Sequence, residues 1–228
     1  MIKDAILDFF FPPKCPFCGK VTEGRVICPV CRRTLPWREE KETVRKLSAS
    51  VSCAVPLWYE EMVREGVLRY KFRGNLSAAE VMGELVARCA AEQYSGEFDT
   101  VTWVPVGPKR LRQRGYDQTR LLAEAACRLW ETQPEQLLCK PVDNRAQSEL
   151  KDPAARRANV LGMYELCSGA SADGKHILLV DDVVTSGATL LECARVLLDA
   201  GAASVQCVAL AAARETGRDE TGENEQNR

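Results

Sequence analysis

The stretch His176-Ile-Leu-Leu-Val-Asp-Asp-Val-Val-Thr-Ser-Gly-Ala-Thr189 decides how this chain of 228 residues folds. The apolar run from Ile177 to Val180 is typical of a strand that is buried on both faces of a sheet. It is followed by Asp181 and Asp182, and a turn of small residues then opens a helix. Ligands of open α/β sheets bind at the carboxyl ends of strands. The stretch therefore predicts a parallel sheet with a binding site at this strand end.

The turn after the two acids predicts a phosphate site. A helix N-terminus with exposed amides and hydroxyls cradles a phosphate, and a glycine lets the backbone approach it closely. Carboxylates accept hydrogen bonds from sugar hydroxyls, or lie near a Mg²⁺ ion that phosphates hold. The pattern therefore suits a ribose 5-phosphate, with the acids at its hydroxyls and the turn at its phosphate. The turn consists of Thr185, Ser186, Gly187, Ala188 and Thr189.

Two familiar phosphate-binding patterns do not account for this turn. The sequence lacks the Walker A pattern G-x4-G-K-[ST] and the dinucleotide-binding pattern G-x-G-x-x-G. A plainer interpretation is a helix capped by Ser or Thr after an exposed strand end. That interpretation leaves the adjacent acids and the five small residues unexplained.

The chain is expected to divide into four parts. Residues 1–13 predict a short amphipathic helix, because apolar side chains recur at helical spacing from Ile2 to Phe10. Residues 14–36 hold four closely spaced cysteines. Residues 50–213 alternate between strand and helix patterns, which predicts an α/β domain with a parallel sheet covered on both faces. Residues 214–228 contain no aliphatic or aromatic side chain, so this tail is expected to be disordered.

Within the α/β domain, hydrophobic periodicity places the elements. Strands are expected around residues 51–57, 100–106, 137–142, 177–180 and 205–210. Helices are expected around residues 61–72, 77–93 and 116–131, and from the small-residue turn to about residue 200. Residues 143–159 are polar and predict a loop.

Four of the 11 cysteines predict a structural zinc site. They form two C-x2-C pairs with nine residues between them, and two such pairs supply a tetrahedral thiolate site with no open position for substrate. Two disulfides or four unrelated thiols are the alternatives, and the absence of an export signal disfavours them. The ligands are Cys15, Cys18, Cys28 and Cys31. The others are expected to be buried free thiols in a reducing cytoplasm: Cys53, Cys89, Cys127, Cys139, Cys167, Cys193 and Cys207.

A basic segment follows the strand that ends near Val106. Residues 109–120 hold five cations against one acid, a local charge of +4. The cations best suit a pyrophosphate group. The backbone of a nucleic acid is the second alternative and could coexist with the first, and a solvated helix start is the third. The five are Lys109, Arg110, Arg112, Arg114 and Arg120.

The stretch from Val180 to Thr189 resembles the 5-phosphoribosyl-1-pyrophosphate (PRPP) loop of type I phosphoribosyltransferases. With the four-cysteine module ahead of it, nearly the whole chain is similar to the ComF family of competence-associated proteins. Further matching segments are Tyr70-Lys71-Phe72-Arg73-Gly74, Val104-Pro105-Val106, Arg114-Gly115-Tyr116-Asp117-Gln118, Arg145-Ala146-Gln147 and Arg156-Arg157-Ala158-Asn159-Val160. One departure is Asp117, where the family usually has Asn.

The resemblance implies roles for these residues. Asp181 and Asp182 would hold the ribose hydroxyls, and the turn would hold the 5-phosphate, with Mg²⁺ bound together with PRPP. A pyrophosphate loop is implied at Val106, Gly107, Lys109 and Arg110. A closing loop that excludes water is implied at Arg112, Arg114 and Gln118.

Composition narrows the functional classes. A net charge of −1 excludes a wholly basic nucleic-acid-coating protein, and the single His176 excludes zinc sites that need two histidines. That histidine is expected to be a polar residue at a strand entry. No apolar run reaches the roughly 18 residues of a membrane span.

Three functions fit these observations. The ComF resemblance implies a cytoplasmic PRPP-binding protein that handles incoming single-stranded DNA with partners of the competence machinery. A metabolic transferase that moves phosphoribose to a base or amine fits the phosphate loop equally well. A zinc-ribbon adaptor for nucleic acid, without turnover, is the third.

Overall fold

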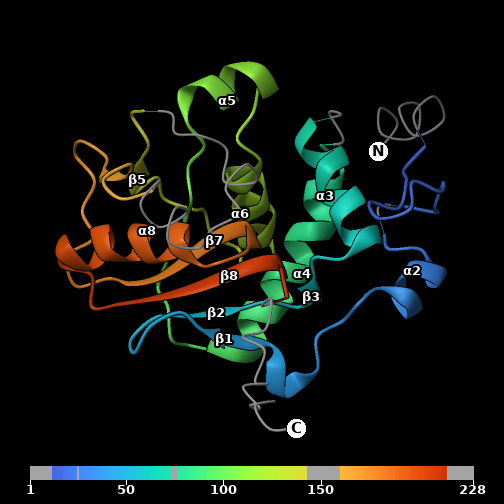
Figure 1. The fold of residues 1–228 in the computed structure, drawn as a ribbon, viewed down its shortest axis with the longest axis horizontal. Coiled ribbons are helices and arrows are strands. Elements are labelled where there is room, and N and C mark those ends of the chain that lie inside the picture. Colours follow the sequence, from blue (N-terminus) through green and yellow to red (C-terminus); the bar gives the residue numbers. More distant parts are fainter. Residues whose placement is uncertain (1–11, 25, 73–75, 143–159, 215–228) are drawn as a thin grey trace, which may run out of the picture.

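The computed structural model describes residues 12–24, 26–72, 76–142 and 160–214 (Figure 1). The predicted helix over residues 1–13, the predicted loop over 143–159 and the predicted tail over 214–228 lie outside the described residues, apart from Pro12, Pro13 and Arg214. So do Gly74, Arg145, Gln147 and Asn159, which contribute to the family resemblance.

A six-stranded sheet forms the centre of the α/β domain. Its order is β1-β2-β8-β7-β4, with β3 also paired to β8. All pairs are parallel except β1–β2, so the predicted fold class is confirmed. The strands are β1 (Val44–Lys46), β2 (Ser52–Ala54), β3 (Leu57–Trp58), β4 (Thr100–Trp103), β7 (His176–Val184) and β8 (Ser204–Ala212).

Strand β7 runs past the two acids instead of ending at Val180. Asp181 pairs with Ala209, and Val183 and Val184 pair with Ala211 and Ala212 of β8. The apolar pattern predicts an earlier end because carboxylates are uncommon in a buried strand. Here β8 is long enough to continue the ladder beyond them.

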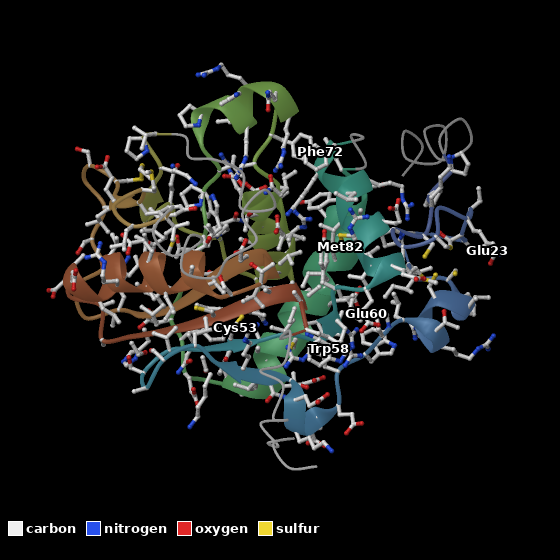
Figure 2. The ribbon with its side chains drawn as sticks, in the orientation of Figure 1. Glu23, Cys53, Trp58, Glu60, Phe72 and Met82 are labelled. Carbon is white, nitrogen blue, oxygen red and sulfur yellow. A yellow bond between two sulfur atoms is a disulfide. The ribbon has the colours of Figure 1, made fainter. Side chains whose placement is uncertain are left out.

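Helices cover both faces of the sheet, and each face has its own core. One core packs α3 (Glu61–Phe72), α4 (Ala78–Tyr94) and α6 (Gln118–Leu129) against Leu178 and Val180. The other packs α8 (Ala188–Asp199) against Ile177 and Leu179. Successive residues of a strand point to opposite faces, which explains this division of the apolar run. Figure 2 shows Met82 and Cys53, both fully buried.

The basic segment forms two helices, where the sequence predicts a loop followed by one helix. Helix α5 covers Pro108–Arg114, and Gly115, with φ of 76°, ends it. Asp117 then caps α6 by accepting hydrogen bonds from the amides of Thr119 and Arg120. A glycine between two helix-compatible stretches permits this sharp break.

The hairpin of β5 (Leu138–Cys139) and β6 (Glu165–Leu166) corrects one prediction about the cysteines. Cys139 and Cys167 are joined by a disulfide, with their Cα atoms 5.1 Å apart, and are not free thiols. The antiparallel register of the hairpin brings together residues that are 28 positions apart. The other five of the seven dispersed cysteines are buried and free, as predicted.

The N-terminal module contains the short helix α2 (Pro29–Thr34) and is followed by a 3₁₀ turn, η1 (Glu40–Glu42). This module lies beside α3 in Figure 1. His176 begins β7, is exposed and contacts the Ser204 hydroxyl at 2.9 Å, in agreement with its predicted place at a strand entry. Among the described helices, none combines the length and the apolar character that crossing a bilayer requires.

Candidate functional site

A cavity of about 450 Å³ opens where β4 and β7 end. Its lining includes most of the residues that the sequence selects: Asp181, Asp182, Thr185, Gly187, Ala188 and Thr189 from one segment, and Val106, Arg110, Arg114 and Gln118 from another. Gly107 caps α5 at the edge of this region. Ser186, Lys109 and Arg112 are not part of the lining, and the last two are exposed.

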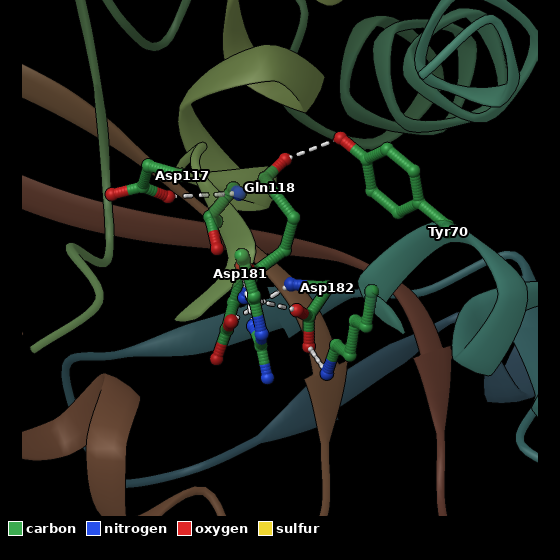
Figure 3. Close-up of polar contacts among 8 residues, drawn as sticks. Tyr70, Asp117, Gln118, Asp181 and Asp182 are labelled. Carbon is green, nitrogen blue, oxygen red and sulfur yellow. Dashed lines mark hydrogen bonds and ion pairs between the residues drawn. The ribbon is translucent and has the colours of Figure 1, made fainter. Parts of the chain in front are cut away.

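Asp182 is buried and engaged from two sides (Figure 3). The Lys71 ammonium lies 2.7 Å from Oδ1, and the Gln118 amide donates to Oδ2 at 3.0 Å. Gln118 in turn accepts a hydrogen bond of 2.6 Å from Arg114. One carboxylate thus gathers groups from α3, α5 and α6 at the end of β7.

Asp181 is half-buried and faces the cavity. Its Oδ1 accepts a hydrogen bond of 2.8 Å from the amide of Asp182. Loss of hydration, together with the neighbouring charge of Asp182, raises the pKa of Asp181 to about 8. The site therefore holds two adjacent carboxyl groups with different environments.

The small-residue turn depends on Gly187. Its φ is 78°, a left-handed conformation that favours glycine, and it lies just before the first turn of α8. A Cβ at this position would lie 2.7 Å from a methyl carbon of Leu47. Arg45 on β1 also donates to the carbonyl of Thr185 at 2.7 Å. The segment around β1 therefore supports the turn through Arg45 and Leu47. No local sequence pattern predicts this role.

Asp117 supports the second strand end. One carboxylate oxygen caps α6, and the other accepts hydrogen bonds from the Trp103 indole at 3.3 Å and the Val106 amide at 3.2 Å. Burial raises the pKa of Asp117, and these hydrogen bonds oppose that rise. An acid at the position where the family usually has Asn thus ties the β4 end to the start of α6.

The structure places Arg114 and Gln118 on different elements, although the sequence groups them in one closing loop. Arg114 is the last residue of α5, and its guanidinium lies 4.7 Å from the centroid of the Phe72 ring. Gln118 begins α6 and is buried. Burial lowers the pKa of Arg114.

Several cavity residues carry no local sequence signal. Lys71, Tyr59 and Phe72 come from α3 and the segment before it, and Lys140 and Tyr164 come from the β5–β6 hairpin. The Lys140 ammonium is buried, and it donates to the Tyr164 hydroxyl at 3.1 Å. Only Lys71 and Phe72 lie in a segment that the family resemblance selects.

The four cysteines of the N-terminal module come together. Their sulfur atoms all lie within 4.8 Å of one another, and the Sγ atoms of Cys18 and Cys28 are 3.6 Å apart. A tetrahedral zinc ion with Zn–S bonds of about 2.3 Å needs sulfurs about 3.8 Å apart. The amide of Cys31 donates to Cys28 Sγ and lowers the pKa of that thiol to about 7. The donor set therefore fits a structural zinc ion.

Comparisons with known proteins agree with this division of the chain. Residues 6–43 match a model of the double zinc ribbon domain, and residues 143–223 match the phosphoribosyl transferase domain. The DNA utilization protein YhgH of Salmonella typhimurium is 31% identical over 206 residues, which cover 84% of this chain and 87% of that protein. This chain belongs to the ComFC/YhgH family.

Other relatives give the same assignment. The competence protein ComFC of Bacillus subtilis is 28% identical over 197 residues, which cover 86% of this chain and 76% of that protein. Among solved structures, an HPRT variant with an invariant aspartic acid changed to glutamic acid has a TM-score of 0.39 at 20% identity. That match covers 61% of this chain and 70% of the other. The two matched domain models and the four-cysteine cluster give this family member a zinc ribbon followed by a phosphoribosyltransferase domain.

Proposed function

We propose that the cavity binds PRPP. The observation that carries this proposal is that paired acids, a left-handed glycine turn and two half-buried arginines line one cavity. The ribose hydroxyls would donate to Asp181 and Asp182. The 5-phosphate would accept hydrogen bonds from the amides and hydroxyls of residues 185–189, at the start of α8.

The pyrophosphate group would lie toward Val106, Arg110 and Arg114. Arginine side chains stabilise the negative charge that builds up on a departing pyrophosphate. Oxygen donors such as the two acids suit Mg²⁺, which would accompany PRPP and neutralise part of its charge. If transfer occurs, the chain's own contribution is to hold the ribose and the leaving group in fixed positions.

We further propose that this activity serves the handling of incoming single-stranded DNA in the cytoplasm. The names of the relatives, a competence protein and a DNA utilization protein, support this role. Exposed Arg32 and Arg33 on α2 supply positive charge on the zinc ribbon, and Trp37 beside them is 40% exposed. Arginine and an exposed aromatic ring suit single-stranded DNA.

A metabolic transferase is the second candidate, and one observation favours it. The wall of the cavity next to the acids is formed by Tyr59, Leu68 and Phe72. An apolar and aromatic wall beside a phosphoribose site suits a planar acceptor base. Release of pyrophosphate in the presence of a panel of bases and amines would distinguish an enzyme from a binding protein.

The test of PRPP binding is calorimetric titration of the zinc-loaded protein in the presence of Mg²⁺. Replacement of both acids by Asn (Asp181→Asn, Asp182→Asn) should abolish Mg²⁺-dependent binding, because the two carboxyl groups that would accept from the ribose hydroxyls and suit Mg²⁺ are lost. The matched control is Asp173→Asn, which changes an exposed acid elsewhere in the domain. Unchanged affinity in the double variant would refute the site assignment.

A further inference from the structure

The zinc ribbon contacts one stripe of helix α3. Met62, Gly66 and Arg69 recur at i, i+4 and i+7, so they share a helix face. Met62 Sδ lies 3.4 Å from Cys31 Sγ, one of the four zinc ligands. A Cβ on Gly66 would lie 3.0 Å from the Pro16 carbonyl oxygen. At Gly66 the backbone of α3 therefore lies close to the backbone of the ribbon, with little room for a side chain.

Arg69 fixes this contact. Its guanidinium donates to the carbonyls of Pro16 and Phe17, which lie between the first two zinc ligands. Phe17 is almost completely buried, with 1% of its surface exposed. The turn that holds Cys15 and Cys18 is therefore attached directly to α3.

The last turn of the same helix contacts the PRPP cavity. The Tyr70 hydroxyl donates to the carbonyl of Gln118 at 2.6 Å, and Lys71 forms the 2.7 Å ion pair with Asp182. Phe72 lies under the Arg114 guanidinium. Three consecutive residues thus contact Asp182, the first residue of α6 and the last residue of α5, and Figure 3 shows the contact of Tyr70 with Gln118.

We propose that α3 couples the zinc ribbon to the PRPP site, and that Arg69 is the positioning residue of this coupling. The proposal rests on the proposed function, because it concerns the affinity of the same cavity for PRPP. Four-thiolate ribbons fold with their metal and unfold without it. Loss of zinc removes the partner of the Met62–Gly66–Arg69 stripe, and α3 is then free to shift Lys71 away from Asp182.

An adjacent face of α3 limits the size of the effect. Val63, Val67 and Tyr70 are fully buried in a core that also includes α4 and α6, so the helix should shift without detaching when the ribbon unfolds. Zinc loss is therefore expected to weaken PRPP binding without abolishing it. Coupling between two sites typically changes affinity by about 5- to 150-fold, and we expect the lower part of that range.

Thermodynamic coupling is reciprocal, which gives a signature that general damage to the fold would not produce. If zinc strengthens PRPP binding, PRPP must strengthen zinc binding by the same factor. Saturating PRPP should therefore protect the zinc of the wild-type ribbon from a competing chelator at equilibrium. In Arg69→Gln the protection should disappear at PRPP concentrations that saturate the variant, while Arg69→Lys should retain part of it.

The experiment measures two quantities in the full chain. One is the PRPP affinity before and after treatment with a chelator selective for zinc over Mg²⁺. The other is the zinc affinity with and without PRPP, measured by competition with the same chelator at equilibrium. Arg64→Gln is the matched control, because Arg64 lies on the same helix and pairs only at the surface with Glu65, at 3.6 Å. It should behave like the wild type in both measurements.

The outcomes separate the two proposals. PRPP affinity that falls about 5-fold or more on zinc removal, with tighter zinc binding in PRPP, supports the coupling. PRPP binding that is insensitive to zinc, or a zinc affinity that is the same with PRPP, overturns the coupling and leaves the proposed function intact. Absence of PRPP binding to the zinc-loaded wild type overturns the proposed function and the coupling together.

Discussion

The zinc ribbon and the cavity are assembled in opposite ways. The four ribbon cysteines lie within residues 15–31, and their spacing alone identifies the site. In the cavity, Lys71 and Asp182 are 111 positions apart, and Gln118 and Asp182 are 64 apart. The ribbon thus gathers its four thiols from one short segment, whereas the cavity depends on the sheet to bring distant segments together. Changes in the two regions should therefore have different consequences.

The largest effect is expected from the loss of a zinc ligand. Cys15→Ala should abolish stoichiometric zinc binding and unfold the ribbon, because structural zinc sites of this kind contribute about 10–16 kcal/mol to folding. Metal content by mass spectrometry and circular dichroism would measure both effects. Cys127→Ala, at a buried cysteine outside the ribbon, is the control and should keep its zinc. A Cys15→Ala protein with full zinc content would contradict the comparison.

The corresponding change in the cavity is Gly187→Val. A branched side chain in the left-handed region, 2.7 Å from Leu47, should lower the free energy of unfolding by about 3–5 kcal/mol and abolish PRPP binding. Urea denaturation and calorimetry would measure these effects, and zinc content should not change. Gly169→Val is a matched control, because Gly169 has φ of 81° but open space around it. If both variants lose the same stability, the contact with Leu47 has no role.

These two regions also show what the sequence could predict. The cysteine spacing, the apolar run of β7 and the small-residue turn are local patterns, so the cluster of four cysteines and the strand, turn and helix of residues 176–199 can be predicted from the sequence. Strand β1 has only three residues, and none of them is buried. The sequence therefore shows no apolar alternation that would predict this strand or the contact with Leu47. Lys71 and Lys140 reach the cavity only through long-range packing, which periodicity does not reveal.

A third test concerns the covalent cross-link beside the cavity. The Cys139–Cys167 disulfide joins β5 to β6, and Lys140 follows directly after it. Cys139→Ser combined with Cys167→Ser should lower the free energy of unfolding by about 2–4 kcal/mol. Thermal melting of the wild type should drop in a reducing agent, and the double variant should not respond. Equal melting of both proteins under oxidising conditions would show that the cross-link does not stabilise the cavity.

The smallest effect, and the only gain in stability, is expected from Asp181→Asn. The pKa of Asp181 is raised to about 8, so between about pH 4 and pH 8 the unfolded chain has released a proton that the folded chain retains. The free energy of unfolding therefore falls as pH rises through this range, and Asn removes this loss. At pH 8 a change of pKa from about 4 to about 8 corresponds to at most about 5 kcal/mol, and solvent screening of the half-buried carboxyl group reduces the expected gain to about 1–2 kcal/mol. At pH 4 the variant should be nearly as stable as the wild type.

Denaturation at both pH values measures this difference, with the exposed Asp173→Asn as the control. A difference between Asp181→Asn and the wild type that does not grow with pH would contradict the assigned environment of Asp181. Asp181→Asn should also bind PRPP more weakly than the wild type. This combination is expected where a carboxyl group serves binding at a cost to stability. The ribbon offers no such substitution, because each of its four cysteines is needed to hold the metal.

The central claim is that Asp181, Asp182 and the turn at residues 185–189 form a PRPP site, and a crystal structure with PRPP and Mg²⁺ tests it most directly. The account predicts the 5-phosphate within hydrogen-bonding distance of the turn amides and the ribose hydroxyls on the two carboxylates. A phosphate bound elsewhere, or an empty cavity at a concentration that saturates binding in solution, would contradict it.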